Sequence, residues 1–256
     1  MKRRYEIHDD QWELIKDVLP AERKKQGGRP AKNNRTMLNA MLWIARTGAP
    51  WRDLPEYYGP WKSVYTRFRR WQMSGVWERV LEQISIEPDF ENVMIDATIV
   101  RVHQHGAGAK GGKQFQAIGR SRGGLTTKIH AIVDALGNPL RFELTGGQNH
   151  DCVTGYDMLK CMELAGANVL ADRAYDTNDI LDFLHEQQAQ PVIPCKKSRK
   201  IQRECDWWLY KERHEIECFF NKIKHYRRIA TRFDKLACTF RAFLTRFGWL
   251  RFEDRP

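Results

Sequence analysis

Cysteine is scarce in this sequence, and no two cysteines lie at the spacing of a metal-binding pair. The 256 residues include six cysteines, which lie singly and form no C-x-x-C pair. This pattern argues against a zinc site and a disulfide scaffold, and it is typical of thiols that stay reduced. No apolar run approaches the ~18 residues of a membrane span, and the opening residues MKRRYEIHDDQWELI are charged throughout. We therefore expect a cytoplasmic protein with no signal peptide and no membrane partner.

Negative charge is also in short supply. The chain has 43 lysines and arginines against 32 acidic residues, a net charge of +11. The excess is concentrated in residues 196–256, which hold 17 basic and 8 acidic residues, whereas residues 92–195 hold 9 and 11. Basic side chains near a phosphate backbone release its counterions, so this imbalance favours a nucleic-acid partner.

Residues 1–90 are predicted to form a helical domain. Apolar residues recur there at helical spacing, between Pro, Gly, Asp and Asn residues that begin or end helices. The predicted helices span 9–19, 34–46, 61–73 and 76–84. Several short helices, one of them studded with basic residues, favour a helix-turn-helix-like DNA-binding domain. The candidate contacts are Lys62, Arg67, Arg69 and Arg70. The alternative is a small helical bundle whose arginines are only solvated.

Residues 91–256 are predicted to fold as an α/β domain. Runs rich in β-branched residues predict strands at 93–102, 125–134, 139–145, 168–171 and 190–193. Helices are predicted over 152–164 and 177–187, in a long segment that carries Glu217, and in an amphipathic segment over 229–252. The order of these elements matches a ribonuclease H-like catalytic core. In that fold the first and fourth strands are neighbours, so Asp96 and Asp172 would meet at the centre of the sheet.

Three carboxylates are candidates for a metal site. Asp96 lies inside an apolar strand, where a charge is expected only if it binds something. Asp172 directly follows another strand, and Glu217 lies on a basic helix. In-line attack on a phosphodiester develops charge on two oxygens that two divalent ions can stabilise, and Mg²⁺ or Mn²⁺ prefers oxygen ligands. We predict that Asp96, Asp172 and Glu217 are catalytic metal ligands for two such ions, with Asp96 bridging them.

The helix around Glu217 presents a mixed acidic and basic face. Tyr210, Arg213, Glu217 and Lys224 are spaced by three, four and seven residues, so at about 100° per residue their side chains share one side of a helix. A carboxylate among two cations and a phenol is suited to holding a metal ion beside a phosphate. Three further basic residues of this region are candidate DNA contacts: Lys222, Arg227 and Arg228.

These motifs resemble the DDE transposases of bacterial insertion sequences, specifically the insertion-sequence-five (IS4/IS5-like) family. The tetrad of Tyr210, Arg213, Glu217 and Lys224 matches that family's Y-x2-R-x3-E-x6-K pattern. Its two other acidic motifs are matched by IDAT around Asp96 and by LADRAYD around Asp172. The stretch TGAPWRDLPEYYGPWKSVYTRFRRW resembles its N-terminal domain. The resemblance covers roughly residues 5–250. It implies donor cleavage and strand transfer, with Tyr210, Arg213 and Lys224 holding the terminal phosphates of the transposon end.

The resemblance also implies the partners. They are double-stranded DNA, as transposon ends and as target, and a second copy of the chain on paired ends, in the bacterial cytoplasm at the nucleoid. No small-molecule substrate is expected. Two alternatives stay open, a nuclease of the same fold and a DNA-binding protein without catalysis.

Two other features are less informative. Gly106, Gly108 and Gly111 spell the G-x-G-x-x-G pattern of dinucleotide binding, but that motif should open a helix and none is expected after it. We interpret this glycine-rich segment as a loop that carries basic residues. Trp207 and Trp208 could stack on an unpaired base, although core packing is expected for at least one of them.

Overall fold

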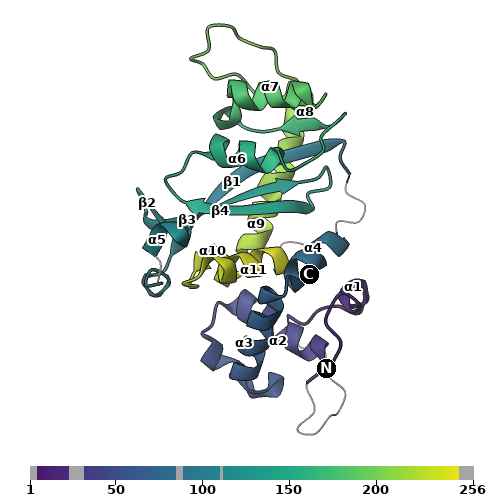
Figure 1. Cartoon of the computed structure of the whole chain (residues 1–256), viewed down its shortest axis with the longest axis vertical. Coiled ribbons are helices and arrows are strands. Elements are labelled where there is room, and N and C mark those ends of the chain that lie inside the picture. The colour runs from purple at the N-terminus through teal and green to yellow at the C-terminus, as the bar shows by residue number, and fades with distance from the viewer. Residues whose placement is uncertain (1–4, 23–31, 85–88, 110–111, 248–256) are drawn as a thin grey trace.

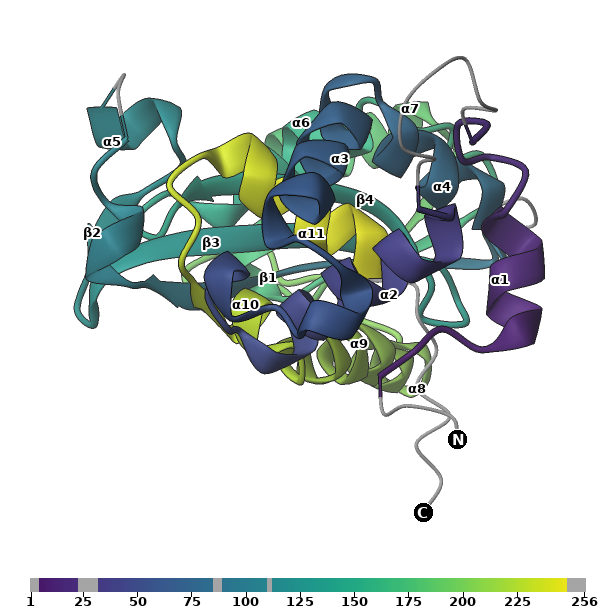
Figure 2. The same cartoon turned by 90° about the horizontal axis from the view of Figure 1, so that it is seen from below.

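A mixed β-sheet and a set of N-terminal helices stack along the long axis of the molecule (Figure 1). The computed structural model describes residues 5–22, 32–84, 89–109 and 112–247. Helices α6 (Asp151–Leu159) and α7 (Asn178–Glu186) lie on one side of the sheet and α9 (His214–Lys224) on the other. Helices α10 (Arg227–Ala230) and α11 (Ala237–Phe247) lie between the sheet and the N-terminal helices in Figure 1 and contact both. Figure 2 shows the same arrangement from below, with the N-terminal helices nearest the viewer. Within the described residues, no helix combines the length and the apolar character that a membrane crossing requires.

The N-terminal helices follow the predicted pattern closely. Their bounds are Asp9–Ile15 (α1), Asn34–Thr47 (α2), Trp61–Met73 (α3) and Val76–Ile84 (α4). The side chain of Asn33 caps α2 by accepting from the backbone N–H of Thr36, and Gly48 ends it with φ 70°, a left-handed conformation that suits glycine. The connection to α3 is a packed loop with two short 3₁₀ helices, Trp51–Asp53 (η1) and Glu56–Tyr58 (η2). The prediction for the first helix was too long, because the chain leaves α1 in a 3₁₀-type turn from Val18 to Ile15.

The sheet has the strand order of a ribonuclease H-like core. Its strands are Asn92–Val102 (β1), Gly119–Ser121 (β2), Gly124–Val133 (β3), Pro139–Gly146 (β4), Asn168–Leu170 (β5), Gln190–Val192 (β6) and Thr231–Arg232 (β7). The order across the sheet is β4-β3-β1-β5-β6, and the short strands β2 and β7 pair with β3 and β1. Strand β3 runs antiparallel to both of its long neighbours, β1 and β4, whereas β5 runs parallel to β1 and β6 parallel to β5. The pairing of β1 with β5 confirms the prediction that the first and fourth strands of the core are neighbours.

The remaining helices connect or cover these strands. They are Gly112–Phe115 (α5), Asp151–Leu159 (α6), Asn178–Glu186 (α7), Trp207–Tyr210 (α8), His214–Lys224 (α9), Arg227–Ala230 (α10) and Ala237–Phe247 (α11). Short 3₁₀ helices lie at Gln104–Gly106 (η3), Arg173–Tyr175 (η4) and Lys211–Arg213 (η5).

Three sequence predictions for these elements need correction. The last amphipathic segment is interrupted, because α10 and β7 precede a helix that begins only at Ala237. Helix α6 ends at Leu159, five residues early. A helix does follow the glycine-rich loop, although none was expected. This helix, α5, has only four residues and is too short for a dinucleotide-binding motif.

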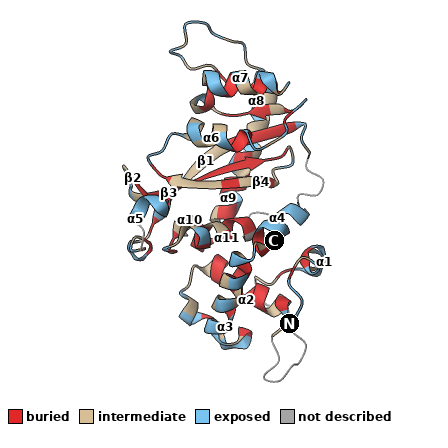
Figure 3. Ribbon diagram, in the orientation of Figure 1, coloured by how far each residue is buried: buried red, intermediate tan, exposed pale blue. Residues whose placement is uncertain are grey.

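Two buried clusters lie on the two faces of the sheet. Alternate residues of β1 point to opposite faces. Val93 and Ile95 therefore join α6 and α7 in one cluster, whereas Met94 joins the other. The second cluster also contains residues of α9, of α11 and of the N-terminal helices. Buried residues, drawn red in Figure 3, are therefore found in both halves of the molecule.

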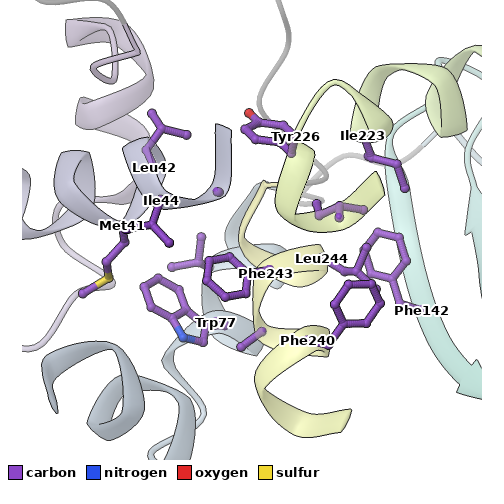
Figure 4. Packing of buried hydrophobic residues seen from close by; sticks show 14 of the residues in the cluster. Met41, Leu42, Ile44, Trp77, Phe142, Ile223, Tyr226, Phe240, Phe243 and Leu244 are labelled. Carbon is purple, nitrogen blue, oxygen red and sulfur yellow. The ribbon is translucent and has the colours of Figure 1, made fainter. Parts of the chain in front are cut away.

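The link between the two halves is aromatic. Phe243 of α11 is fully buried and stacks on Phe68 of α3, with ring centroids 4.9 Å apart. Figure 4 shows Phe240, Phe243 and Leu244 between the side chains of the N-terminal helices and Phe142 of β4. Residues on either side of residue 90 thus share one hydrophobic core.

Candidate active site

Asp96 and Asp172 come together because their strands are paired in parallel. The last paired residues are Met94 of β1 and Leu170 of β5, and each aspartate lies two residues further along its chain. Neighbouring strands are about 4.8 Å apart, so the two carboxylates are placed side by side at the end of the pairing. Both side chains also point to the α9 face, because Met94 and Leu170 belong to the cluster on that face.

Each aspartate is oriented by a local backbone donor. The N–H of Ala97 donates to Oδ1 of Asp96 at 2.7 Å, and the N–H of Ala174 donates to Oδ1 of Asp172 at 2.8 Å. The second contact caps the 3₁₀ helix η4, which starts directly after Asp172. Each carboxylate therefore has its other oxygen left to bind elsewhere.

Helix α9 and the turns before it bring the tetrad to the sheet. The buried stripe Ile216, Phe219, Phe220 and Ile223 packs this helix on the sheet. The run from Trp207 through η5 to Lys224 is helical, so the predicted common side is observed. Arg213 lies 5.7 Å from the ring of Tyr210 and contacts Glu217 one turn later.

Arg213 joins the two acidic motifs. Its Nη1 donates to Oδ2 of Asp96 at 2.9 Å, and its Nη2 donates to Oε1 of Glu217. Lys224 extends the contact with β1, because its Nζ donates to Oγ1 of Thr98 at 2.6 Å. The structure thus places all three predicted carboxylates around one part of the sheet, with a cation between two of them.

The electrostatic environment of Asp96 favours a bound positive charge. Burial raises the pKa of Asp96 above its ordinary value, and the negative charge of Asp172 adds to the rise. The hydrogen bond from Ala97 and the charge of Arg213 oppose it. A carboxylate in this setting gains from any further cation, because the cation offsets both burial and the neighbouring acid.

Arg213 lies between two of the three predicted metal ligands. Among the described residues, no three histidine, cysteine, aspartate or glutamate side chains are close enough together to hold a metal ion. The guanidinium group of Arg213 instead contacts both Asp96 and Glu217. The donor set of three carboxylates fits Mg²⁺ or Mn²⁺, and the guanidinium shows that positive charge is accommodated there.

Two side chains close to the acidic site, those of Tyr175 and Asp176, were not among the predicted site residues. The phenol of Tyr175 is buried, and its hydroxyl has no hydrogen-bond partner among the described residues. Burial, and then the charges of Asp96, Asp151 and Asp172, raise the pKa of Tyr175 well above its ordinary value. The second residue, Asp176, has a fully buried side chain that ion-pairs with Arg199 and Arg203. The sequence offered one signal for Asp176, a charged residue close to the end of an apolar strand.

Replacing Asp176 by asparagine is expected to destabilise the fold by about 2 kcal/mol at pH 7. Burial alone would raise the pKa of Asp176, but hydrogen bonds from Arg199, the Lys196 backbone and Arg203 outweigh it and lower the pKa from 3.8 to about 2. A depressed pKa stabilises the fold above pH 4, and this contribution is lost as pH falls towards 2. Urea unfolding at several pH values checks this. A deficit in the variant that stays constant down to pH 2 would contradict it.

The predicted DNA contacts fall into two groups. Lys62, Arg70, Lys222 and Arg227 are exposed. The others are engaged inside the protein. Arg67 donates to the backbone of Lys32, and Arg69 donates to Oγ1 of Thr239.

Arg228 corrects the sequence prediction most clearly. It is buried and pairs with Asp234 through two nitrogens, at 3.1 and 2.8 Å, and it also donates to the backbone of Ala49. Its partner lies six residues later, after a strand that was not predicted. Arg228 therefore holds α10 to the end of α2 and does not present its charge to solvent.

Lys222 and Arg228, two basic residues six positions apart, should consequently behave differently in DNA binding. We expect Lys222→Ala to make the negative slope of log Kobs against log[salt] shallower by about 0.9, the value of one phosphate contact. Arg228→Met should leave the slope unchanged and lower only the thermal stability. Filter binding at four salt concentrations measures both. Equal slopes for Lys222→Ala and the wild type would remove Lys222 from the interface.

The sheet order and the adjacent aspartates define a ribonuclease H-like protein with an acidic site. Two family models match the chain, "Putative transposase of IS4/5 family" over residues 7–81 and "Transposase DDE domain" over residues 88–250. The second covers more than half of the chain. The chain therefore belongs to the IS4/IS5 family of DDE transposases.

Two curated relatives match part of the chain, and the name of the first agrees with the family. The chain is similar to the "Putative transposase for insertion sequence element IS6501" of Brucella ovis, with 44% identity over 121 residues, 47% of this chain and 92% of that protein. It is also similar to the "Uncharacterized protein y4sN" of Sinorhizobium fredii, with 47% identity over 114 residues, 43% of this chain and 90% of that protein.

Solved structures give a weaker likeness. A Mos1 transposase paired-end complex with left transposon end matches with 13% identity and a TM-score of 0.29, over 89% of this chain and 80% of that one. A piggyBac transposase synaptic complex with hairpin DNA matches with 11% identity and a TM-score of 0.41, over 73% of this chain and 47% of that one. The fold assignment rests on the strand order and the family, since scores this low add nothing to it.

Proposed function

We propose that this protein cuts DNA at the ends of its own insertion sequence and joins the freed 3′ ends to target DNA. The observation that carries the proposal is the pair Asp96 and Asp172 at neighbouring strand ends, with Glu217 held against them through Arg213. Double-stranded DNA is the substrate, and a homodimer on paired ends would supply one site for each end.

The three carboxylates would hold divalent metal ions. Members of the DDE transposase family use such ions, and Asp96, Asp172 and Glu217 supply the oxygen ligands that Mg²⁺ and Mn²⁺ prefer. When bound, two ions stabilise the charge that develops on the attacking and leaving oxygens. We infer that Arg213 exchanges Asp96 for a DNA phosphate as the ions enter.

The surrounding residues would position the DNA. Arg213 can hold a phosphate with two parallel N–H donors, and Lys224 offers a point charge further along β1. Tyr210 is half-buried beside Arg213 and keeps its guanidinium in place through the ring face. Residues 1–90 would form the domain that recognises the ends, with the exposed Lys62 and Arg70 on phosphates.

A joining assay tests the proposal. The protein is incubated with Mg²⁺, a supercoiled plasmid and the element's terminal repeat, supplied as a duplex already cut to a 3′-OH. The matched control is the same duplex with a 3′-dideoxy end, which cannot be joined. Joined products from the first duplex alone support a transposase. Cutting of an uncut repeat without joining would favour a nuclease, and binding without either reaction would favour a non-catalytic DNA-binding protein.

A further inference from the structure

Residues 196–203, which we name the basic loop, form a strongly charged part of the connection from β6 to α8. The loop holds five basic residues and no acidic one. This connection forms the upper end of the molecule in Figure 1, beyond α7. None of the predicted DNA contacts lies in it.

A single buried carboxylate fastens the basic loop to the core. Asp176 accepts from the Lys196 backbone at 2.7 Å, from Nε of Arg199 at 2.8 Å and from Nη2 of Arg203 at 2.8 Å. Its side chain is fully buried. Most runs of like charge are solvated and change shape freely. This loop is tied at both ends and near its middle, so much of the entropy cost of ordering it on a partner is already met.

The anchor lies close to the catalytic aspartates. Asp176 follows Asp172 by four residues, which at full extension span at most ~14 Å, and the 3₁₀ helix η4 between them shortens that path. Duplex DNA carries one charge per ~1.7 Å of its axis. A duplex with its reacting phosphate at Asp172 therefore has further phosphates within reach of the loop.

The lysine side chains of the basic loop are available to bind a partner. Lys197 and Lys200 are exposed and Lys196 is half-buried, and none of the three has an ion-pair partner in the described parts of the chain. Ile201 is 82% exposed beside them, and Trp208 at the start of α8 is 80% exposed, with the ammonium of Lys211 over its ring. Exposed apolar groups among unpaired lysines are suited to a nucleic-acid surface.

We propose that the basic loop binds the phosphate backbone of duplex DNA beside the catalytic carboxylates, with Asp176 holding it in place. Ammonium groups contact phosphates without reading bases, so this contact is independent of sequence. The inference rests on the proposed function for its geometry, because the reacting phosphate is placed at Asp172.

The test is the salt dependence of binding to a duplex of arbitrary sequence, without metal. The variant carries Lys196→Ala, Lys197→Ala and Lys200→Ala. Three lost phosphate contacts should make the negative slope of log Kobs against log[salt] shallower by about 2.7 and weaken binding at ~0.1 M salt by at least tenfold. The corresponding triple Lys→Arg variant should keep the wild-type slope. Circular dichroism confirms that each variant is folded.

The matched control removes three charges elsewhere: Lys16→Ala directly after α1, Arg79→Ala on α4 and Lys160→Ala directly after α6. Its slope should change by less than about one. An alanine loop variant with the wild-type slope, or with no larger change than this control, would overturn the inference.

The joining assay keeps the two proposals apart. If the wild type joins DNA but the alanine loop variant keeps its slope, the loop inference fails and the transposase proposal stands. If the wild type shows no reaction but its binding depends on the loop, the loop inference stands and the transposase proposal fails.

Discussion

Replacing Asp172 by asparagine is expected to abolish DNA cleavage and joining, with rates falling by at least about 10³-fold, while DNA binding persists. The change keeps the size of the side chain and an oxygen that can accept from Ala174. It removes the negative charge that would hold a divalent ion. Losing the several kcal/mol of transition-state stabilisation that such ions supply corresponds to a rate loss of this order. Asp96→Asn should act alike, because the two carboxylates lie side by side.

The measurement is single-turnover cleavage of an end duplex in Mg²⁺. Asp157→Asn is a suitable control, since Asp157 is an exposed residue of α6 that pairs with Lys160. That variant should cleave at the wild-type rate. A tenfold or smaller loss in Asp172→Asn would show that this carboxylate is not a metal ligand.

Replacing Phe243 by alanine is expected to destabilise the whole chain by about 3–5 kcal/mol, the usual cost of emptying a buried phenylalanine site. Phe243 is fully buried and lies against Phe68 and Trp51 of the N-terminal half, while its helix packs on β4 (Figure 4). The two halves share this core, so they should unfold together.

Urea unfolding followed by tryptophan fluorescence and by far-ultraviolet circular dichroism checks this expectation. The buried Trp71 and Trp77 report on the N-terminal helices, and the dichroism reports on all helices and strands. Coincident transitions, both shifted in Phe243→Ala, are predicted. Phe115→Ala removes the same atoms from an 84% exposed position and should change the free energy of unfolding little. Two separate transitions, only one of them shifted, would mean independent domains.

The sequence was informative wherever local periodicity and spacing decide the structure. The β-branched run around Asp96 predicted β1, the apolar stretch before Asp172 predicted β5, and the ribonuclease H-like order made them neighbours. The spacing of Arg213 and Glu217 put both on one side of a helix, and one turn of helix indeed brings them into contact.

Tertiary contacts were not predictable in the same way. Arg227 and Arg228 are adjacent and identical in type, yet one is exposed and the other is buried against Asp234. Their difference is set by the interruption of the last helical segment, where α10 gives way to β7. Asp176 likewise gains its role only because the loop after β6 folds back over it. A single sequence contains no local signal for either contact.

The most direct test of the central claim is the position of Mn²⁺ in a crystal of the protein bound to its end DNA. Anomalous scattering locates the ion independently of the protein chain. We predict that the strongest peak lies between the carboxylates of Asp96 and Asp172, with Arg213 released from Asp96. A crystal in which Arg213 still bridges Asp96 and Glu217, with Mn²⁺ bound elsewhere, would contradict the assignment of these carboxylates as the catalytic metal site.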